Sequence, residues 1–365
     1  MTMTPWIDAY RGRRVLVTGH TGFKGGWLSL WLSELGADVT GYSLAPWTEP
    51  NFFTAARIGS RVRHREGDVR DLASLRAAWQ ACRPDVVFHL AAQPIVRESY
   101  RNPVDTVTTN VVGTTHVLEL ARESTSPVAV VCVTSDKCYD NVEWPYGYRE
   151  DDRLGGADVY SGSKAAAEVI VSSFQRSFFT SVDRPAVASA RAGNVIGGGD
   201  WATDRIVPDC IRALSVGRTI EVRNPHAVRP WQHVLEPLSA YLTLGARLQQ
   251  RDETGLAARG PWNFGPTIPN ARSVGAVVSA VIREWGAGEW RQPPANAAGP
   301  EATLLRLAID KAQIQLGWSP RWDFDEAIGH TVHWYKAFYA GADMAACATA
   351  QIAEFVQRGA AVARI

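Results

Sequence analysis

The stretch RRVLVTGHTGFKGGWLSLWLSELGADVTGYS, residues 13–43, joins an apolar run to three evenly spaced glycines and then to an apolar helical pattern. Val15–Val17 is typical of a buried strand, and Gly19, Gly22 and Gly25 follow it directly. The start of a helix placed there offers free N–H groups and a positive dipole end to a pyrophosphate. The stretch therefore predicts a nucleotide-binding turn. A tight structural turn in some other α/β protein is the alternative.

Length, charge and composition narrow the class of protein. A chain of 365 residues is long enough for two lobes. A net charge of +1, from 38 basic and 37 acidic residues, argues against nucleic acid or a membrane surface as the main partner. No apolar run approaches the roughly 20 residues of a membrane span, and the N-terminus lacks the apolar core of a signal peptide.

The cysteines and histidines indicate neither disulfides nor a metal site. The five cysteines are odd in number and include no Cys-x-x-Cys pair. They are typical of free thiols in a reducing compartment, so we expect a cytoplasmic protein. The eight histidines include no His-x-x-x-His pair, so no metal site is predicted.

Strand and helix patterns alternate through the first half of the chain. Alternation of this kind predicts an α/β fold with a doubly wound, parallel, Rossmann-type sheet. Buried strands are expected at Val15–Val17, Asp38–Tyr42, Val86–His89, Val128–Val133 and Pro185–Ala190. Helices are expected at Gly22–Leu35, Leu72–Cys82, Asn110–Arg122 and Val159–Phe179.

The pattern changes after Arg191 to an irregular, glycine-rich stretch followed mainly by helices. We expect a smaller, mainly helical C-terminal lobe over the carboxyl edge of the sheet. AVRPWQHV and PWNFGP are interpreted as returns to the sheet, and residues 286–302 as a mobile loop. Helices are expected at Val274–Trp285, Leu304–Leu316 and Asp325–Tyr339. The predicted division is a Rossmann domain at 1–192 with a return at about 229–263, a lobe at 193–228 and 264–345, and a helical tail at 346–365.

The adenosine end of the predicted nucleotide site is less well defined. The second strand ends without the acidic residue that often holds the ribose of NAD, and Lys24 inside the turn is compatible with an extra phosphate. The turn therefore does not choose between NAD and NADP. Asp68, after the third strand, is placed to reach the adenine or, equally, to cap the helix that starts near Leu72.

Tyr160 and Lys164 lie four residues apart in VYSGSKAAAE, on one face of a predicted helix. A lysine cation beside the phenol lowers the pKa of the tyrosine. Such a tyrosine can take the proton of a sugar hydroxyl while hydride leaves the same carbon. The alternative is an exposed Tyr and Lys at a common spacing, but the preceding glycine turn and strand–helix units favour the catalytic interpretation.

A second set of polar residues follows the strand that ends near Val133. Thr134, Ser135, Asp136 and Lys137 come in sequence at its carboxyl end, the edge where open α/β sheets bind ligands. A hydroxyl, a carboxylic acid and an amine are thus concentrated at one point. A solvent-exposed polar loop is the alternative.

Several stretches together resemble the extended short-chain dehydrogenase/reductase family. They are GHTGFKGGW, HLAAQPIVRESY, TSDKCYDN, YSGSKAAAE, RAGNVIGGGDWATDRIVPD and RPWQHVLEPL, and the resemblance runs from about residue 10 to 340. Within the family, the sugar dehydratases carry an acid/base pair that the 4-epimerases lack. The dTDP- and GDP-sugar branches have Asp-Glu where this chain has Asp136-Lys137, and the Asp-Lys form resembles the branch that uses CDP-sugars.

The resemblance implies a dehydration of CDP-glucose. Tyr160, assisted by Ser135 and Lys164, oxidises the C4 hydroxyl while hydride passes to NAD. Lys137 then removes the C5 proton, Asp136 protonates the departing C6 hydroxyl, and hydride returns to C6 to give CDP-4-keto-6-deoxyglucose. Because an ammonium cannot accept a proton, the pKa of Lys137 must fall from about 10.4, and burial and nearby positive charge would lower it.

The resemblance also implies sites and partners. The implied cofactor is NAD, and a homodimer or tetramer is expected. Residues near the cofactor are Gly19, Thr21, Gly22, Phe23, Lys24, Gly25, Asp68, Val69, Leu90, Ala91, Ala92, Tyr160 and Lys164. Residues near the sugar diphosphate are Gln93, Ser135, Asn194, Arg205 and Arg229. Either of the two arginines has a surface ion pair as its alternative role.

Two other functions stay open from the sequence. One is dehydration or 4-epimerisation of another nucleotide hexose, and the other is a non-catalytic NAD(P)-sensing regulator. The Asp136-Lys137 pair argues against the epimerase, which eliminates no water. A regulator would not need all of Ser135, Tyr160 and Lys164.

Overall fold

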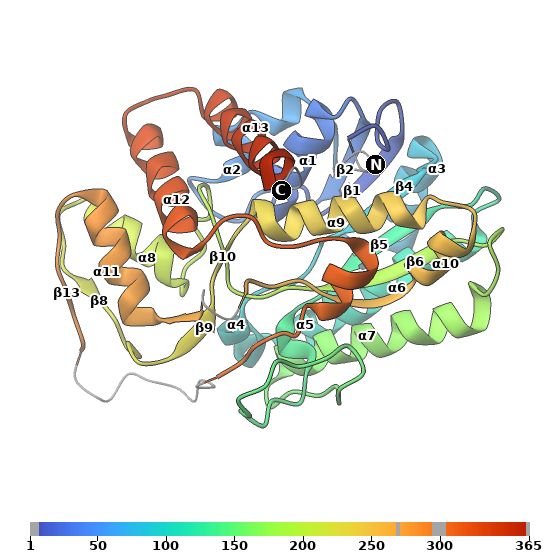
Figure 1. Cartoon of the computed structure of the whole chain (residues 1–365). Helices are drawn as coiled ribbons and strands as arrows, with labels where there is room; N and C mark the ends of the chain where they lie inside the picture. The colour runs from blue at the N-terminus through green and yellow to red at the C-terminus, as the bar shows by residue number, and fades with distance from the viewer. Residues whose placement is uncertain (1–6, 268–270, 294–303, 363–365) are drawn as a thin grey trace.

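The computed structural model describes residues 7–267, 271–293 and 304–362. Its centre is a seven-stranded sheet in the order β11-β6-β5-β4-β1-β2-β3, with every neighbouring pair parallel (Figure 1). The strands are β1 (Arg14–Thr18), β2 (Asp38–Ser43), β3 (Arg63–Glu66), β4 (Val86–His89), β5 (Ala129–Val133), β6 (Ala186–Arg191) and β11 (Gly260–Asn263). The order reverses between β1 and β4, which confirms the predicted doubly wound sheet.

Helices cover both faces of this sheet, and other helices form a smaller lobe. They are α1 (Phe23–Glu34), α2 (Phe52–Ala55), α3 (Leu72–Cys82), α4 (Val96–Arg101), α5 (Pro103–Val107), α6 (Gly113–Glu123), α7 (Val159–Phe178), α8 (Ile206–Leu214), α9 (Leu235–Leu248), α10 (Glu253–Ala257), α11 (Val274–Trp285), α12 (Phe324–Tyr339) and α13 (Met344–Val362). Short helical turns are η1 (Ile58–Ser60), η2 (Thr108–Val112), η3 (Asp136–Cys138) and η6 (Ala312–Leu316).

The central strands are apolar throughout because alternate side chains enter two different cores. Val15 and Val17 of β1 pack into the core that includes α1 and α9. Leu16 points the opposite way, into the core that includes α3, α6 and α7. Burial on both faces is what the continuous apolar runs predicted. The edge strand β3 differs, since all four of its residues, Arg63–Glu66, are exposed.

A smaller, mainly helical lobe follows β6, as expected. It contains α8, α11 and α12, which pack in sequence against one another. Three short pairings complete it: β7 (Val195–Ile196) with β10 (Gln232–His233), β8 (Ile220–Glu221) with β13 (Trp290–Arg291), and β9 (Val228–Pro230) with β12 (Ala271–Ser273). Figure 1 shows this lobe beyond the carboxyl ends of the strands.

Several sequence expectations for this half were wrong in part. PWNFGP does return to the sheet, as β11 beside β6, but AVRPWQHV forms β9 and β10 outside it. The segment predicted as a helix from Leu304 runs extended at first, where Leu307 pairs with Tyr148, and η6 begins only at Ala312. Of the expected loop 286–302, residues 290–291 form β13, and 294–302 lie outside the described residues.

The last helix packs on the first. Phe355 of α13 meets Trp31 of α1 edge-on, with ring centroids 5.8 Å apart (Figure 1). Asp343, just before α13, forms an ion pair with Arg57. The expected helical tail therefore begins at Met344, and its end at residues 363–365 lies outside the described residues.

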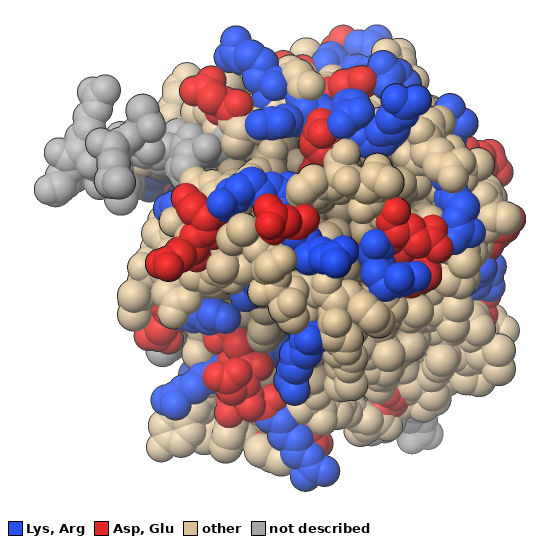
Figure 2. All heavy atoms as spheres, turned by 90° about the vertical axis from the view of Figure 1, so that its right-hand side faces the viewer, with Lys and Arg blue, Asp and Glu red and all other residues tan. Residues whose placement is uncertain are grey.

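The surface and the cysteines agree with the composition. The face at the right of Figure 1 carries basic and acidic side chains interspersed (Figure 2). All five cysteines are free, and four of them are buried. Across residues 7–267, 271–293 and 304–362, no helix has the length and apolar character needed to cross a membrane. The same ranges contain no cluster of three or more His, Cys, Asp or Glu suited to a metal ion.

Candidate active site

The glycine turn brings backbone close to backbone, as a phosphate-binding turn requires. Gly19 has φ +78°, and a Cβ there would lie 2.7 Å from the Ala91 nitrogen. A Cβ at Gly25 would lie 2.1 Å from the Gly19 oxygen. Gly22 caps α1 without a side-chain hydrogen bond, and no acid occupies the first turn. The N–H groups at the start of α1 are therefore left for a ligand, which fits a pyrophosphate.

The surrounding residues expected near a cofactor lie at neighbouring strand ends. Phe23 is the first residue of α1. Thr21 bonds to Ser43 Oγ at 2.8 Å and donates to the Leu44 carbonyl at 2.9 Å, which fixes the turn to the end of β2. Leu90, Ala91 and Ala92 follow β4, and the Ala91 N–H donates to Thr18 Oγ1 at 3.3 Å.

Asp68 does not cap α3. The N-cap is Asp71, whose carboxylate accepts from the Ala73 and Ser74 N–H groups at 3.0 and 3.1 Å. Asp68 instead accepts from the Arg70 backbone at 2.8 Å, and a side-chain hydrogen bond from Arg70 lowers the pKa of Asp68. Beside it, Val69 packs so closely on α6 that a Cβ at Gly113 would approach its side chain to 2.7 Å.

Ser135 and Asp136 lie where the sequence predicted, at the carboxyl end of β5. Both are buried, and Ser135 Oγ donates to Asp136 Oδ1 at 3.0 Å while it accepts from the Lys137 N–H at 3.2 Å. Asp136 Oδ2 is buried and has no hydrogen-bond partner within the described chain. Gly193 permits this position, because a Cβ there would lie 2.0 Å from Oδ2. Lys137 is half-buried on η3.

Tyr160 and Lys164 lie on the buried side of α7, which packs against η3. Asp158 starts this helix by accepting from the Ser161 N–H at 2.9 Å. Burial raises the pKa of Tyr160 to about 12, and a hydrogen bond with Ser135 opposes the rise. The positive charge that opposes the rise is that of Arg205, and not that of Lys164 as expected. Burial also lowers the pKa of Lys164 to about 8.

Lys24 lies beside the reacting groups. Its ammonium is 5.9 Å from the Tyr241 ring. Burial and the positive charges of Arg205 and Lys164 together lower its pKa to about 7, against the opposing effect of Asp136. The extra-phosphate interpretation of Lys24 loses its support, because the ammonium faces the cluster around Asp136 instead.

Of the residues expected near the sugar diphosphate, Arg205 lies near Tyr160, whereas Asn194 and Arg229 lie on other segments of the small lobe. Arg205 is close enough to Tyr160 and Lys24 to shift their pKa values, and its Nη1 donates to Asp200 at 2.8 Å. Asn194 has φ +51° just before β7, and Arg229 lies half-buried on β9.

Gln93 is occupied largely within the protein. Its Nε2 donates to Thr106 at 2.8 Å, and its Oε1 accepts from the Ile95 N–H at 2.6 Å. Asn110 was not anticipated, yet it accepts from the Gln93 N–H at 2.9 Å and donates to Ser163 Oγ at 2.8 Å. An amide inside the helical stretch TTNVVGT was the available signal. Gln93 and Asn110 together shape the loop after β4 against α7.

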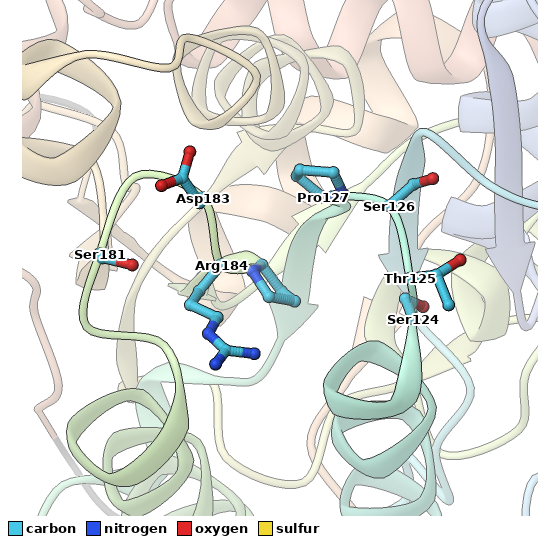
Figure 3. Close-up of a pocket in the computed structure, with 8 residues that line it drawn as sticks. Ser124, Thr125, Ser126, Pro127, Ser181, Asp183 and Arg184 are labelled. Atoms are coloured by element: carbon cyan, nitrogen blue, oxygen red, sulfur yellow. The ribbon is translucent and has the colours of Figure 1, made fainter.

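A separate cavity of about 380 Å³ lies at the opposite edge of the sheet. Its walls are residues 124–127 before β5 and 181–185 before β6, and Figure 3 shows Arg184 between the two loops. These are the amino ends of the strands. Ligands of open α/β sheets bind at the carboxyl ends of the strands. This cavity is therefore separate from the candidate site around Ser135 and Tyr160.

The fold and the Tyr160–Lys164 pair at the carboxyl edge define an extended short-chain dehydrogenase/reductase. The chain belongs to the GDP-mannose 4,6 dehydratase family, whose pattern matches residues 16–331. It is also similar to a CDP-glucose 4,6-dehydratase of Salmonella typhimurium, with 46% identity over 352 residues, or 95% of this chain and 97% of that protein.

Solved structures show the same fold at lower identity. An epimerase of Methanothermobacter thermautotrophicus has a TM-score of 0.75 and 23% identity, covering 93% of this chain and 96% of its own. A dTDP-glucose 4,6-dehydratase of Bacillus anthracis, solved with NAD, has a TM-score of 0.73 and 20% identity, covering 91% and 99%. Because an epimerase and a dehydratase share the fold, it does not by itself choose the reaction.

Proposed function

We propose that this protein converts CDP-glucose to CDP-4-keto-6-deoxyglucose with NAD as a resident cofactor. The observation that carries the proposal is the buried cluster of Ser135, Asp136 and Tyr160 at the carboxyl edge, with Lys137 beside it. The similarity to a CDP-glucose 4,6-dehydratase along 95% of the chain supports the nucleotide and the sugar.

NAD fits the turn between β1 and α1. The close approaches at Gly19 and Gly25 leave no room for side chains, and the start of α1 presents uncapped N–H groups. These groups would hold the pyrophosphate, with the adenosine toward Asp68 and Val69 at the end of β3. When bound, NAD supplies the acceptor for a hydride from C4 and the donor that returns it to C6.

The chain's own groups would move the protons. Tyr160 takes the proton of the C4 hydroxyl as its own proton moves to Ser135, with which it shares a hydrogen bond, and the Ser135 proton moves to Asp136 Oδ1. The new ketone acidifies the C5 hydrogen, which Lys137 removes. Asp136 protonates the departing C6 hydroxyl. Its Oδ2 has no partner within the described chain, so it is placed to carry that proton to a substrate oxygen.

Arginines in the small lobe would bind the diphosphate. A planar guanidinium can hold two phosphate oxygens at once. Arg205 already lies beside the reacting groups, and Arg229 and Asn194 lie on adjoining segments of the lobe. Gln93, with one N–H of its amide left over, would contact the sugar.

A homodimer or a tetramer built from dimers is part of the proposal. Large apolar side chains are exposed on α4, α5 and α7, which pack side by side. They are Tyr100, Val104, Val107, Val169 and Phe178, exposed by 64%, 74%, 41%, 51% and 45%. Exposed apolar surface of this kind marks an interaction site. Analytical sedimentation of the protein tests whether it forms a dimer or a tetramer.

The free thiols support a cytoplasmic location for the protein.

Hydrogen labels test the reaction. Substrate with deuterium at C4 is expected to give product with deuterium at C6 of the same molecule, and heavy water is expected to place deuterium at C5. A 4-epimerase would return the label to C4 and keep the C6 hydroxyl, whereas a regulator would give no product. Loss of the C4 label to water would contradict the proposal. Running CDP-glucose, dTDP-glucose, UDP-glucose and GDP-mannose side by side tests the nucleotide.

A further inference from the structure

A buried ion pair lies next to Lys164 along the same face of α7. Glu168 is one helical turn beyond Lys164 on α7, and its carboxylate is 2.8 Å from the Arg191 guanidinium of β6. The two side chains are only 2% and 3% exposed. A charge buried this deeply destabilises the protein strongly unless it is paired, so loss of either partner would be costly.

Glu168 also joins three elements of the carboxyl edge. Ser189 Oγ of β6 donates to its Oε2 at 2.6 Å, and Thr134 Oγ1, at the end of β5, donates to its Oε1. Arg191 makes further hydrogen bonds, and its Nη1 donates to the Tyr139 hydroxyl at 2.6 Å. Of the two charges of the pair, that of Glu168 is the one that acts on Lys164 of the same helix.

We propose that Glu168 is a positioning residue for the reaction, which keeps Lys164 in its ammonium form beside Tyr160. This inference rests on the proposed function only for its kinetic consequence. The geometry follows from the helix itself, because residues four apart lie one above the other on the same face.

The electrostatic surroundings of Lys164 agree with this role. Burial lowers the pKa of Lys164 to about 8, and Glu168 is the largest influence in the opposite direction. Without that carboxylate, the ammonium would lose its proton at lower pH. Groups from other elements that act on Lys164, or on which it acts, are Lys24 of α1, His89 of β4, Cys132 of β5 and Cys138 of η3.

These other groups cannot replace Glu168 at neutral pH. Burial raises the pKa of Cys132 to about 12 and that of Cys138 well above its usual value, so both thiols are uncharged. Burial lowers the pKa of His89 to about 3, which leaves the ring neutral. Lys24 is itself cationic when protonated and opposes a second charge nearby.

The test is a direct titration of Lys164 in the full chain loaded with NAD. The sequence holds five lysines, so ¹³Cε-lysine NMR gives few signals, and Lys164→Arg identifies the signal of Lys164. We expect the midpoint of Lys164 to lie about one pH unit lower in Glu168→Gln than in the unmodified protein. Glu168→Asp, which keeps the charge, should bring the midpoint most of the way back to that of the unmodified protein.

Controls separate the charge from the structure. Ser189→Ala removes one hydrogen bond to Glu168 and keeps its charge, so the midpoint should not move. Because Glu168→Gln leaves Arg191 buried without its carboxylate, Glu168→Gln/Arg191→Met serves as a second variant that removes both charges. An unchanged Lys164 midpoint in a folded form of either Gln variant would overturn the proposal.

The kinetic consequence has a definite sign. If Lys164 must be charged, activity is lost as pH rises through its pKa, and Glu168→Gln moves that alkaline limb of kcat/KM to lower pH by the same shift. The NMR midpoint needs no substrate. Failure of the proposed dehydration would therefore leave the titration intact, whereas failure of this inference would appear as an unshifted midpoint.

Discussion

The polar groups around Asp136 and those around Glu168 are paired differently, and we call them the front cluster and the rear cluster of the carboxyl edge. In front, Asp136 has a buried oxygen without a partner in the described chain, and burial displaces the pKa values of Tyr160 and Lys24 in opposite directions. Behind, in the rear cluster, both oxygens of Glu168 accept hydrogen bonds and one meets Arg191, although Arg191 Nε is also buried without a partner in the described chain. An unpaired carboxylate oxygen costs stability, so the difference between the two carboxylates marks Asp136 as the one available to a ligand.

Two tyrosine substitutions test this comparison with the largest expected effect. Tyr160→Phe removes the proton acceptor in front, so we expect product formation to fall about 10³-fold or more with little change in stability. Tyr139→Phe removes a hydroxyl behind, which bonds to Arg191 and Asn263 at 2.6 and 2.8 Å. It should lower the free energy of unfolding by about 1–2 kcal/mol. Near-normal turnover by Tyr160→Phe would contradict its role.

Lys137→Ala separates the steps within the front cluster. The C4 oxidation should survive, because Tyr160 and Ser135 are untouched, but removal of the C5 proton should slow by about 10²-fold or more. Reduced cofactor should then accumulate, which its near-ultraviolet absorbance measures in a single turnover. Elimination at the normal rate would remove Lys137 from the mechanism.

Gly193→Ala disturbs the front cluster through packing. The added Cβ would lie 2.0 Å from Asp136 Oδ2, so the carboxylate must move. We expect activity to fall about tenfold and stability by about 1–3 kcal/mol, which turnover and denaturant unfolding measure. Gly162→Ala is the matched control on α7, because nothing lies within 4 Å of its added Cβ. If both variants behaved alike, close packing at Asp136 would be irrelevant.

Glu236 sharpens the comparison, since it is a buried carboxylate without a charged partner like Arg191. It accepts from the Arg321 and Trp322 N–H groups at 2.9 and 2.7 Å, and burial raises its pKa to about 7. The folded state therefore holds a proton that the unfolded state releases between about pH 4.3 and 7, so stability falls as pH rises through that window.

Glu236→Gln removes this titration and has the smallest expected effect. Stability should match the unmodified protein near pH 4 and exceed it by on the order of 2 kcal/mol at pH 8. Thermal unfolding at the two pH values measures the difference. Equal stability at pH 8 would mean that the carboxylate gains a partner or reaches water.

The apolar pattern located the strands that are buried on both faces, but it set no bounds for the exposed third strand before Asp68. Continuous apolar runs mark β1, β4 and β5, whereas Arg63–Glu66 of β3 is charged and exposed at the edge. The apolar spacing from Leu304 predicted a helix, but those side chains pack from an extended segment beside Tyr148. Periodicity alone does not distinguish a helix from an extended strand when the segment is short.

The site was predictable where its residues follow strand ends. Ser135 and Tyr160 come together because the end of β5 and the start of α7 meet at one edge. The position of Lys24, the Arg191–Glu168 pair and the clearance at Gly193 were not predictable. Each depends on an approach between segments distant in sequence, which no local pattern records.

The contact between α13 and α1 also has a consequence for the order of synthesis. The helix that opens at the phosphate turn is made well before Phe355, whose ring packs on Trp31. Until α13 has left the ribosome, this side of α1 lacks its permanent cover. A nascent chain stalled before residue 344 would expose this tryptophan. Chaperones bind exposed apolar surface of this kind, and incomplete chains aggregate through it.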